Sequence, residues 1–325
     1  MTTLVTGGTG FIGSHVVEAL LARGEAVRCL VRSPDRLRWL SGLDVDMVTG
    51  DCNSPDSLSR AVADVDRVIH LAGATFAPTE AAFFYYNAAG TRNLLDACLA
   101  SGRIACFVMV SSQAAAGPGT RENPARETDP PRPLTPYGRS KLAAERHCRA
   151  AADRLSVRIL RPSAVYGPRD TAFLPYFRLV KRGFLLEFGV GPREISLCYV
   201  NDLAEGIVRV ADSHLESGSV YFIADSEPYS WDSVEKRLCA RWGVKGRRVV
   251  VPGIVLKTAG VIGQAYGALR RKSVLINRAR AAEILEKHWV CDSTAAQRDF
   301  GYSPETNLEN GLNKAVRWYE LNNWL

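Results

Sequence analysis

The chain has 325 residues, 46% of them hydrophobic and 23% charged, which is the composition of a soluble globular protein with a large core. Its formal net charge is +7, but the basic residues look scattered, and short clusters such as Arg247-Arg248 and Arg270-Arg271-Lys272 are typical of solvated edges. This pattern argues against a nucleic-acid-binding protein, whereas an anionic cofactor or substrate would suit the positive surplus.

Eight cysteines are widely spaced, none forms a Cys-x-x-Cys motif, and no histidine cluster accompanies them. They are Cys29, Cys52, Cys98, Cys106, Cys148, Cys198, Cys239 and Cys291. Several lie in apolar runs, as buried free thiols do, so we expect a reduced, cytoplasmic protein without a structural metal site. The first residues run directly into an apolar strand, so a signal peptide is not expected.

Residues 249–269 form a long apolar stretch in which Lys257 is the only charged residue. Pro252 and glycines at 253, 260, 263 and 267 make this stretch a poor membrane-spanning helix, so no integral membrane segment is predicted. We expect a helix that covers the substrate, and peripheral contact with a membrane surface stays open as an alternative.

The N-terminal part of the chain has the pattern of a dinucleotide-binding unit. It comprises a strand at 3–6, the loop glycines Gly7, Gly10 and Gly13, a helix at 14–23 and a strand at 27–31. Glycines let the backbone approach a diphosphate, which the free N–H groups of the following helix bind. The spacing is Gly-x-x-Gly-x-x-Gly rather than Gly-x-Gly-x-x-Gly, and its position after a buried strand favours cofactor binding over a simple turn.

The end of the second strand bears on which dinucleotide binds. NAD sites usually place Asp or Glu there for a ribose hydroxyl, whereas an arginine suits the 2′-phosphate of NADP. Residues 30–33 contain Arg32 and no acid, and Arg36 follows nearby. We therefore favour NADP(H), with NAD(H) as the other option and a solvated arginine as the plain alternative.

The rest of the chain alternates strands with helices. Further strands are predicted at 45–49, 68–73, 105–110, 157–160 and 220–224, and helices at 55–63, 80–101, 137–155 and 202–211. This alternation predicts an α/β fold with a doubly wound parallel sheet of about seven strands. We assign residues 1–168 and 201–227 to a dinucleotide-binding domain, and residues 169–200 and 228–325 to a smaller, interleaved substrate-binding lobe.

Candidate catalytic residues follow the fifth strand. Ser111 and Ser112 end that strand, at the edge where parallel sheets bind ligands. After a Pro/Gly-rich loop at 117–136, Tyr137 and Lys141 lie four residues apart on one helix face. A nearby ammonium lowers the pKa of a phenol, and such a pair can move a proton at an alcohol oxygen that a serine holds. Taken alone, Tyr-x-x-x-Lys is more often an aromatic ring packed under a solvated lysine.

In combination, these motifs resemble the extended short-chain dehydrogenase/reductase family, also called the NAD-dependent epimerase/dehydratases. The residues that support the resemblance are Thr6 to Gly13, Gly50-Asp51, His70 to Gly73, Asn87, Gly90 to Leu95, Ser111-Ser112, Tyr137, Lys141, Arg161-Pro162, Val165 to Pro168 and Tyr199 to Ala204. The resemblance covers nearly the whole chain and implies a Rossmann fold. It also implies a homodimer formed through the helices near 80–100 and 137–155.

The resemblance and the motif positions together give a set of site residues. Catalysis is assigned to Ser112, Tyr137 and Lys141, with Tyr137 as the general acid/base and Ser112 orienting the oxygen. Cofactor binding is assigned to Gly7, Gly10, Phe11, Ile12, Gly13, Arg32, Asp51, Cys52, Leu71, Ala72, Gly73, Asn87, Ser111, Tyr137, Lys141, Pro162, Ser163 and Val165. No metal site is expected.

Departures from the family patterns narrow the function. Gln113-Ala114 stand where sugar-nucleotide dehydratases have Asp-Glu, and Ile195 stands where epimerases commonly have a phosphate-binding arginine, for which Arg193 could substitute imperfectly. The C-terminal half looks nearest to the dihydroflavonol-reductase and 3β-hydroxysteroid-dehydrogenase branch.

We therefore expect an NAD(P)-dependent oxidoreductase that transfers a hydride between nicotinamide and a secondary alcohol or ketone of an apolar or mixed-polarity small molecule. The alternative is a nucleotide-sugar 4-epimerase that uses transient oxidation by bound NAD. A cofactor-sensing or scaffold protein on the same fold is a third hypothesis, which the intact Ser-Tyr-Lys set disfavours.

Overall fold

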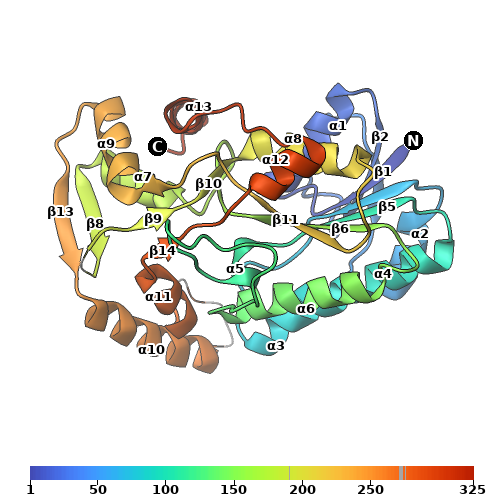
Figure 1. Cartoon of the computed structure of the whole chain (residues 1–325), viewed down its shortest axis with the longest axis horizontal. Coiled ribbons are helices and arrows are strands. Elements are labelled where there is room, and N and C mark those ends of the chain that lie inside the picture. Colours follow the sequence, from blue (N-terminus) through green and yellow to red (C-terminus); the bar gives the residue numbers. More distant parts are fainter. Residues whose placement is uncertain (190, 271–273, 275) are drawn as a thin grey trace.

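Seven parallel strands form the central sheet of the protein, in the order β11-β6-β5-β4-β1-β2-β3 (Figure 1). They are β1 (Thr2–Thr6), β2 (Ala26–Val31), β3 (Asp46–Thr49), β4 (Arg67–His70), β5 (Cys106–Val110), β6 (Val157–Pro162) and β11 (Ser219–Ile223). The computed structural model describes residues 1–189, 191–270, 274 and 276–325, so Arg271 and Lys272 of the basic cluster lie outside the described residues. The predicted doubly wound α/β fold is confirmed.

Both faces of the sheet are apolar and buried, as crossover helices on both sides require. Side chains alternate along each strand: Leu4 and Phe107 belong to one core cluster, and Val5 and Val108 belong to the other. Helices α1 (Phe11–Ala22), α8 (Val200–Asp212) and α12 (Thr294–Phe300) cover the upper face in Figure 1. Helices α2 (Pro55–Val62), α4 (Gly90–Ser101) and α6 (Pro136–Ala150) cover the lower face.

The long helix predicted at 80–101 has an irregular centre. It consists of α3 (Glu80–Phe83), a π-helical segment η2 (Phe84–Ala89) and α4. Shorter differences include the start of α1 at Phe11, the end of β4 at His70, the end of α6 at Ala150 and an unpredicted helix α5 (Gln113–Ala116) after β5. Because π segments often occur at functional sites, the position of Asn87 inside η2 draws attention to this helix.

A smaller lobe lies beside the carboxyl ends of the strands (Figure 1). Its elements are β7 (Ala164–Tyr166), α7 (Leu174–Lys181), β8 (Phe184–Phe188), β9 (Glu194–Ile195), β10 (Leu197–Tyr199), β12 (Tyr229–Ser230), α9 (Trp231–Trp242), β13 (Arg247–Val251), α10 (Gly253–Arg270), α11 (Arg278–Leu285), β14 (His288–Trp289) and α13 (Leu308–Leu321). Aromatic side chains from α7, α9 and α13 form the core of this lobe. A short 3₁₀ turn, η1 (Arg38–Leu40), follows β2.

None of the helices that the structure describes combines the length and the hydropathy needed to span a bilayer.

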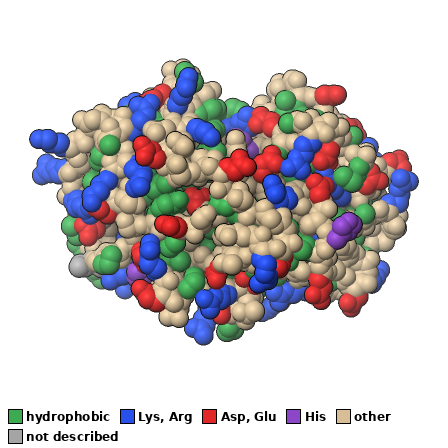
Figure 2. All heavy atoms as spheres, turned by 45° about the horizontal axis from the view of Figure 1, so that its top comes forward, with side chains coloured by type: hydrophobic (Ala, Val, Ile, Leu, Met, Phe, Trp, Pro, Cys, Tyr) green, Lys and Arg blue, Asp and Glu red, His purple; other side chains and the backbone are tan. Residues whose placement is uncertain are grey.

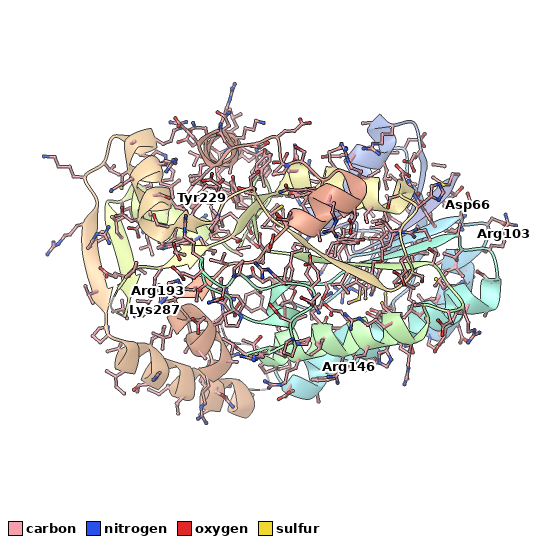
Figure 3. All side chains as sticks on the ribbon, viewed as in Figure 1. Asp66, Arg103, Arg146, Arg193, Tyr229 and Lys287 are labelled. Atoms are coloured by element: carbon pink, nitrogen blue, oxygen red, sulfur yellow. The ribbon has the colours of Figure 1, made fainter. Side chains whose placement is uncertain are left out.

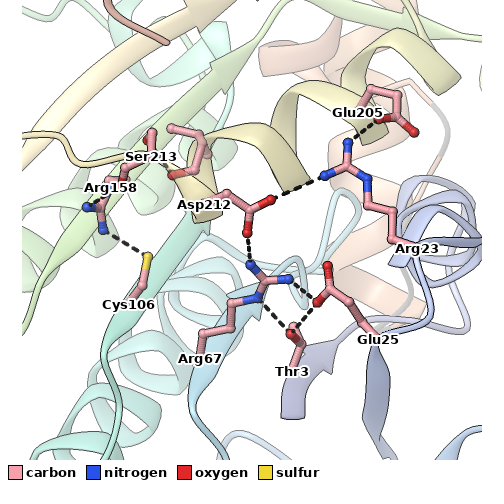
Figure 4. A network of polar contacts seen from close by, with 10 residues as sticks. Thr3, Arg23, Glu25, Arg67, Cys106, Arg158, Glu205, Asp212 and Ser213 are labelled. Carbon is pink, nitrogen blue, oxygen red and sulfur yellow. Dashed lines mark hydrogen bonds and ion pairs between the residues drawn. The ribbon is translucent and has the colours of Figure 1, made fainter. Parts of the chain in front are cut away.

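An ion network closes the amino end of the sheet, opposite the edge where the candidate catalytic residues lie (Figure 4). At its centre is Arg67, whose side chain is only 3% exposed. Its guanidinium pairs with Glu25 and with Asp212, and its Nε donates to Thr3 Oγ1 at 2.7 Å. The network therefore ties the starts of β1, β2 and β4 to the end of α8.

Replacing Arg67 by alanine is expected to lower the free energy of unfolding by about 3 kcal/mol, because Glu25 would keep a largely buried and unpaired charge. Arg103→Ala is the matched control, since the Arg103–Asp64 pair is exposed on both sides and should contribute less than about 1 kcal/mol. Urea unfolding of both variants measures the difference. Equal, small losses in the two variants would show that the network contributes no more than a surface pair.

Candidate active site

The glycine loop between β1 and α1 packs too closely for larger residues. Gly7 has φ of +75°, and a Cβ there would lie 2.7 Å from the backbone nitrogen of Ala72. A Cβ on Gly13 would lie 2.2 Å from the carbonyl oxygen of Gly7. Gly10 caps α1 without a side-chain bond, and the first turn of the helix has no acid. The N–H groups of Phe11, Ile12 and Gly13 thus remain available for an anionic group.

The corner beyond β2 and β3 holds the residues assigned to the adenosine end. Asp51 Oδ1 accepts from the backbone nitrogen of Asn53 at 2.8 Å, and Cys52 beside it is buried. Burial raises the pKa of the Cys52 thiol to about 12, and the charge of Arg32 opposes this rise. Arg32 is exposed and lies within electrostatic range of this corner, which suits a phosphate carried on the adenosine ribose.

The end of β4 is held by buried polar contacts. His70 lies between Thr6 Oγ1 at 2.7 Å and Thr91 Oγ1 at 2.9 Å, and burial lowers its pKa to about 3. A neutral, fully bonded imidazole of this kind is structural. The strand end places Leu71, Ala72 and Gly73 beside the glycine loop, where Thr6 Oγ1 accepts from the backbone nitrogen of Ala72 at 3.2 Å.

Asn87, in the π segment, links three parts of the site. Its Oδ1 accepts from the backbone nitrogen of Ala74 at 2.7 Å, and its Nδ2 donates to Ser140 Oγ at 2.9 Å. Ser140 in turn donates to the carbonyl oxygen of Tyr137 at 2.7 Å. A Cβ on Gly73 would meet Asn87 Oδ1 at 3.0 Å and Lys141 Nζ at 3.9 Å, so Asn87, Gly73 and Lys141 share one small space.

The structure brings Ser112, Tyr137 and Lys141 together at the carboxyl end of β5. Ser112 caps α5, where its Oγ accepts from the backbone nitrogen of Ala114 at 3.1 Å, and its hydroxyl lies close enough to the Tyr137 phenol to oppose the rise in the pKa of that phenol. Lys141 is 4% exposed and donates from Nζ to the carbonyl oxygen of Val110 at 2.7 Å. The first turn of α6 is fixed by Thr135, whose hydroxyl accepts from the backbone nitrogen of Gly138.

Burial controls the protonation of this trio. It raises the pKa of Tyr137 to about 12, with a further rise from the charge of Glu283 on α11 and a partial opposition from the Ser112 hydrogen bond. It also lowers the pKa of Lys141 to about 8, which the charge of Glu145 opposes. The sequence predicts that Lys141 lowers the pKa of Tyr137. In the protein alone desolvation of the phenol dominates, so Tyr137 is a protonated acid at neutral pH.

Ser111 has a different environment from Ser112. Its hydroxyl donates to Glu145 Oε1 at 2.5 Å, and Arg161 binds the same carboxylate through Nε at 3.0 Å and Nη2 at 2.7 Å. Both Glu145 and Arg161 have side chains that are 1% exposed. The Ser111 hydroxyl is therefore part of a buried ion pair, and Ser112 is the serine that faces the phenol.

Pro162 is the last residue of β6, and Ser163 and Val165 follow it at the same edge of the sheet. Ser163 is 7% exposed, and its Oγ has no hydrogen-bond partner among the described residues. A buried hydroxyl of this kind is ready to bind a polar group of a ligand. Together with the close-packed glycine loop and the open N-terminus of α1, it fits a pyridine dinucleotide.

Arg193 does not face the site as a phosphate ligand. Its guanidinium donates to four carbonyl oxygens, those of Phe188, Ile284, Leu285 and Glu286, at 2.7–3.2 Å. It therefore caps the C-terminus of α11, beside Lys287 in Figure 3. The substitution for an epimerase arginine that the sequence left open is not supported by these contacts, because the donors of Arg193 are already used.

The comparisons with known proteins agree with this arrangement. Residues 3–224 match the model of the NAD dependent epimerase/dehydratase family.

The chain belongs to this family.

It is similar to a ceramide reductase of Caulobacter vibrioides, with 30% identity over 99% of this chain and 95% of the relative. It is also similar to a 2-alkyl-3-oxoalkanoate reductase of Stenotrophomonas maltophilia, with 31% identity over 97% and 98% of the two chains. Among solved structures, a UDP-glucuronic acid 4-epimerase from Bacillus cereus with UDP-glucuronic acid and NAD superposes with a TM-score of 0.79, 25% identity and coverage of 99% and 100%.

The protein is therefore an enzyme of the extended short-chain dehydrogenase/reductase type that uses a pyridine nucleotide. The sequence predicted that Ser112, Tyr137 and Lys141 come together at the end of β5, but it missed Glu283. That residue is far from the trio along the chain, and no local pattern could have placed it near Tyr137.

For a carbonyl reduction, kcat/KM is expected to fall as the pH rises through about 8. The Lys141 ammonium is charged below its pKa and neutral above it, so its stabilisation of a developing phenolate is present at low pH and lost at high pH. In Lys141→Arg the group stays charged, and the fall near pH 8 should disappear. Steady-state pH profiles test this, and a fall near pH 8 that persists in Lys141→Arg would assign it to another group.

Proposed function

We propose that the protein is a reductase that prefers NADP(H) and reduces a ketone to a secondary alcohol in an apolar or mixed-polarity small molecule. The observation that supports it most directly is the protonated Tyr137 phenol, which lies beside Ser112 at the end of β5 with the buried Lys141 one helical turn away. A phenol with a pKa near 12 is an acid at neutral pH, and a ketone needs a proton on its oxygen as it is reduced.

The bound cofactor would supply the hydride. Tyr137 would donate its proton to the carbonyl oxygen of the substrate, and the Ser112 hydroxyl would hold that oxygen in place. The Lys141 ammonium would stabilise the phenolate that remains, and a proton from solvent would restore the tyrosine. The glycine loop, Asp51, Asn87 and Ser163 would bind and orient the cofactor.

Two features support a reductase over a nucleotide-sugar 4-epimerase. The epimerase position for a phosphate-binding arginine is Ile195, and Arg193 is engaged with the end of α11. The two relatives described above are named as reductases of a ceramide and of a 2-alkyl-3-oxoalkanoate, which favours a substrate with an alkyl chain.

The epimerase remains the second candidate because of the solved structure that holds UDP-glucuronic acid and NAD. Cofactor behaviour separates the two functions: a reductase consumes NADPH in proportion to product, whereas an epimerase shows no net consumption. Turnover of UDP-sugars without loss of reduced cofactor would favour the epimerase.

The two-part domain division (1–168 with 201–227, and 169–200 with 228–325), the cytoplasmic location and the homodimer also belong to this proposal. Two elements depart from that division, since β7 packs in the core of the smaller lobe and α12 packs on the central sheet. The dimer would form through α4 and α6, which pack side by side on one face of the sheet. Light scattering of the purified protein would establish its mass.

Tyr137→Phe should reduce kcat by roughly 10²–10⁴-fold, because it removes the general acid, and should leave NADPH binding nearly intact. Tyr86→Phe is the control, since Tyr86 is an exposed tyrosine on the neighbouring π segment. Steady-state kinetics with a ketone panel and titration of NADPH fluorescence measure both quantities. Unchanged turnover in Tyr137→Phe would reject the assignment.

Arg32→Ala should weaken NADPH binding by about ten-fold or more and leave NADH binding unchanged, because only NADPH carries a 2′-phosphate for the guanidinium. Arg60→Ala, an exposed arginine on α2, is the control. Calorimetric titration with each nucleotide gives the affinities. The NADP(H) preference would be wrong if the wild-type protein bound NADH as tightly as NADPH.

A further inference from the structure

One segment of the chain has a larger net positive charge than the protein as a whole. Residues 236–282 contain twelve Lys and Arg and no Asp or Glu. The other residues contain the remaining twenty-nine Lys and Arg against thirty-four Asp and Glu, and are therefore net negative. The basic residues are thus concentrated, contrary to the scattered distribution that the short clusters suggested. Figure 2 shows part of this charge as Lys and Arg side chains projecting at the left end of the molecule, where α9 and β13 lie in Figure 1.

Helix α10, inside this segment, has its apolar side chains on the outside. Its buried face is made of glycines and Leu256: a Cβ on Gly260 would lie 3.0 Å from Ala281 Cβ, and one on Gly263 would lie 2.0 Å from the carbonyl oxygen of Ile276. The opposite face, which we call the α10 face, consists of Ile254, Val255, Val261, Ile262 and Tyr266, which are 50–70% exposed. Large apolar side chains gathered on one exposed helix face mark an interaction surface.

The charged residues of α10 flank this face. Lys257 is three residues from Ile254 and four from Val261, and Arg270 lies over the Tyr266 ring with its guanidinium carbon 5.9 Å from the ring centroid. Both are exposed, and neither forms an ion pair with any of the described residues. On β13, the exposed Val249 and Val250 continue the apolar surface toward Arg247 and Arg248.

We propose that the α10 face docks on the surface of an anionic lipid bilayer, with the helix lying in the plane of the interface. An apolar stripe flanked by Lys and Arg is the pattern of an interfacial helix, because the apolar side chains enter the acyl boundary and the cations bind lipid phosphates. A second copy of this chain fits less well. A two-fold interface would place the cations of this face, Lys257 and Arg270, against the same cations of the second copy.

The position of α10 would place the bound membrane close to the candidate active site. In Figure 1, α11 lies between α10 and the body of the protein, and the two helices pack against each other. Glu283 of α11 is close enough to Tyr137 to influence its protonation. The bilayer would therefore meet the protein one helix away from the catalytic phenol. The docking itself is independent of the reaction proposed above, since it is measured without substrate.

The test is co-sedimentation of the full chain with phosphatidylcholine vesicles, with and without a minority of phosphatidylglycerol, at about 0.1 M and about 1 M salt. We expect binding only to the anionic vesicles, and weaker binding at high salt. The double variant Ile254→Ser/Ile262→Ser should bind at least about ten-fold more weakly, and so should Lys257→Glu/Arg270→Glu. Leu321→Ser and Arg317→Glu are matched controls on α13, with Leu321 72% exposed, and should bind like the wild type.

Three results would overturn the proposal. The first is that the wild type does not bind anionic vesicles, and the second is that the α13 controls lose as much vesicle binding as the α10 variants. The third is that only the charge variant loses vesicle binding, which would show adsorption without insertion of α10. Light scattering tests the alternative that the α10 face binds a second copy of the chain. If the wild type binds no vesicle and forms a dimer that Ile254→Ser/Ile262→Ser dissociates, the α10 face is a contact between copies. Thermal melting confirms that each variant is folded, as expected for changes to exposed side chains.

Discussion

The hydrogen bond from Lys141 Nζ to the carbonyl oxygen of Val110 sets the distance between α6 and the end of β5. An ammonium enclosed in this way loses most of its hydration, and it is tolerated because Glu145 follows four residues later on the same buried face. Glu145 is in turn bound by Arg161 at the end of β6 and by Ser111 at the end of β5. One stripe of α6 therefore aligns a phenol, an ammonium and a carboxylate, and the ends of two strands bind to it.

This arrangement determines how the site can work. Arg161 and Ser111 hold the Glu145 carboxylate away from the phenol, so the proton available at the rim of the sheet belongs to Tyr137. The same burial makes Tyr137 a weaker acid and makes the Lys141 ammonium easier to deprotonate, so the two pKa values move apart, to about 12 and about 8. A pair of groups tuned in opposite directions can share the charge that develops when a proton leaves the phenol.

The sequence predicted most of the sheet and much of the site because the signals were local. Apolar strands, the Gly7–Gly13 spacing and the Tyr137–Lys141 interval all depend on residues a few positions apart. The contacts that could not be predicted join distant segments: Arg193 reaches carbonyl groups some ninety residues further along the chain, and Glu283 approaches Tyr137 from α11. The acid-free segment is a property of the sequence, but it emerges only across the whole range 236–282, because each basic cluster within it is short. The outward-facing apolar side of α10 needed the structure, since the same residues could equally have faced the protein.

The π segment in the middle of the long helix limits which insertions and deletions this protein can accept there. A π turn is an α-helix with one residue too many, so the stretches before and after it differ in rotational phase by about 100°. Glu80, ahead of the bulge, pairs with Arg139 on α6, while Thr91, behind it, bonds His70 at the end of β4. A single deletion within residues 84–89 would restore ideal helical register and put these two contacts out of step. The length of this segment is therefore constrained by contacts on both sides of it.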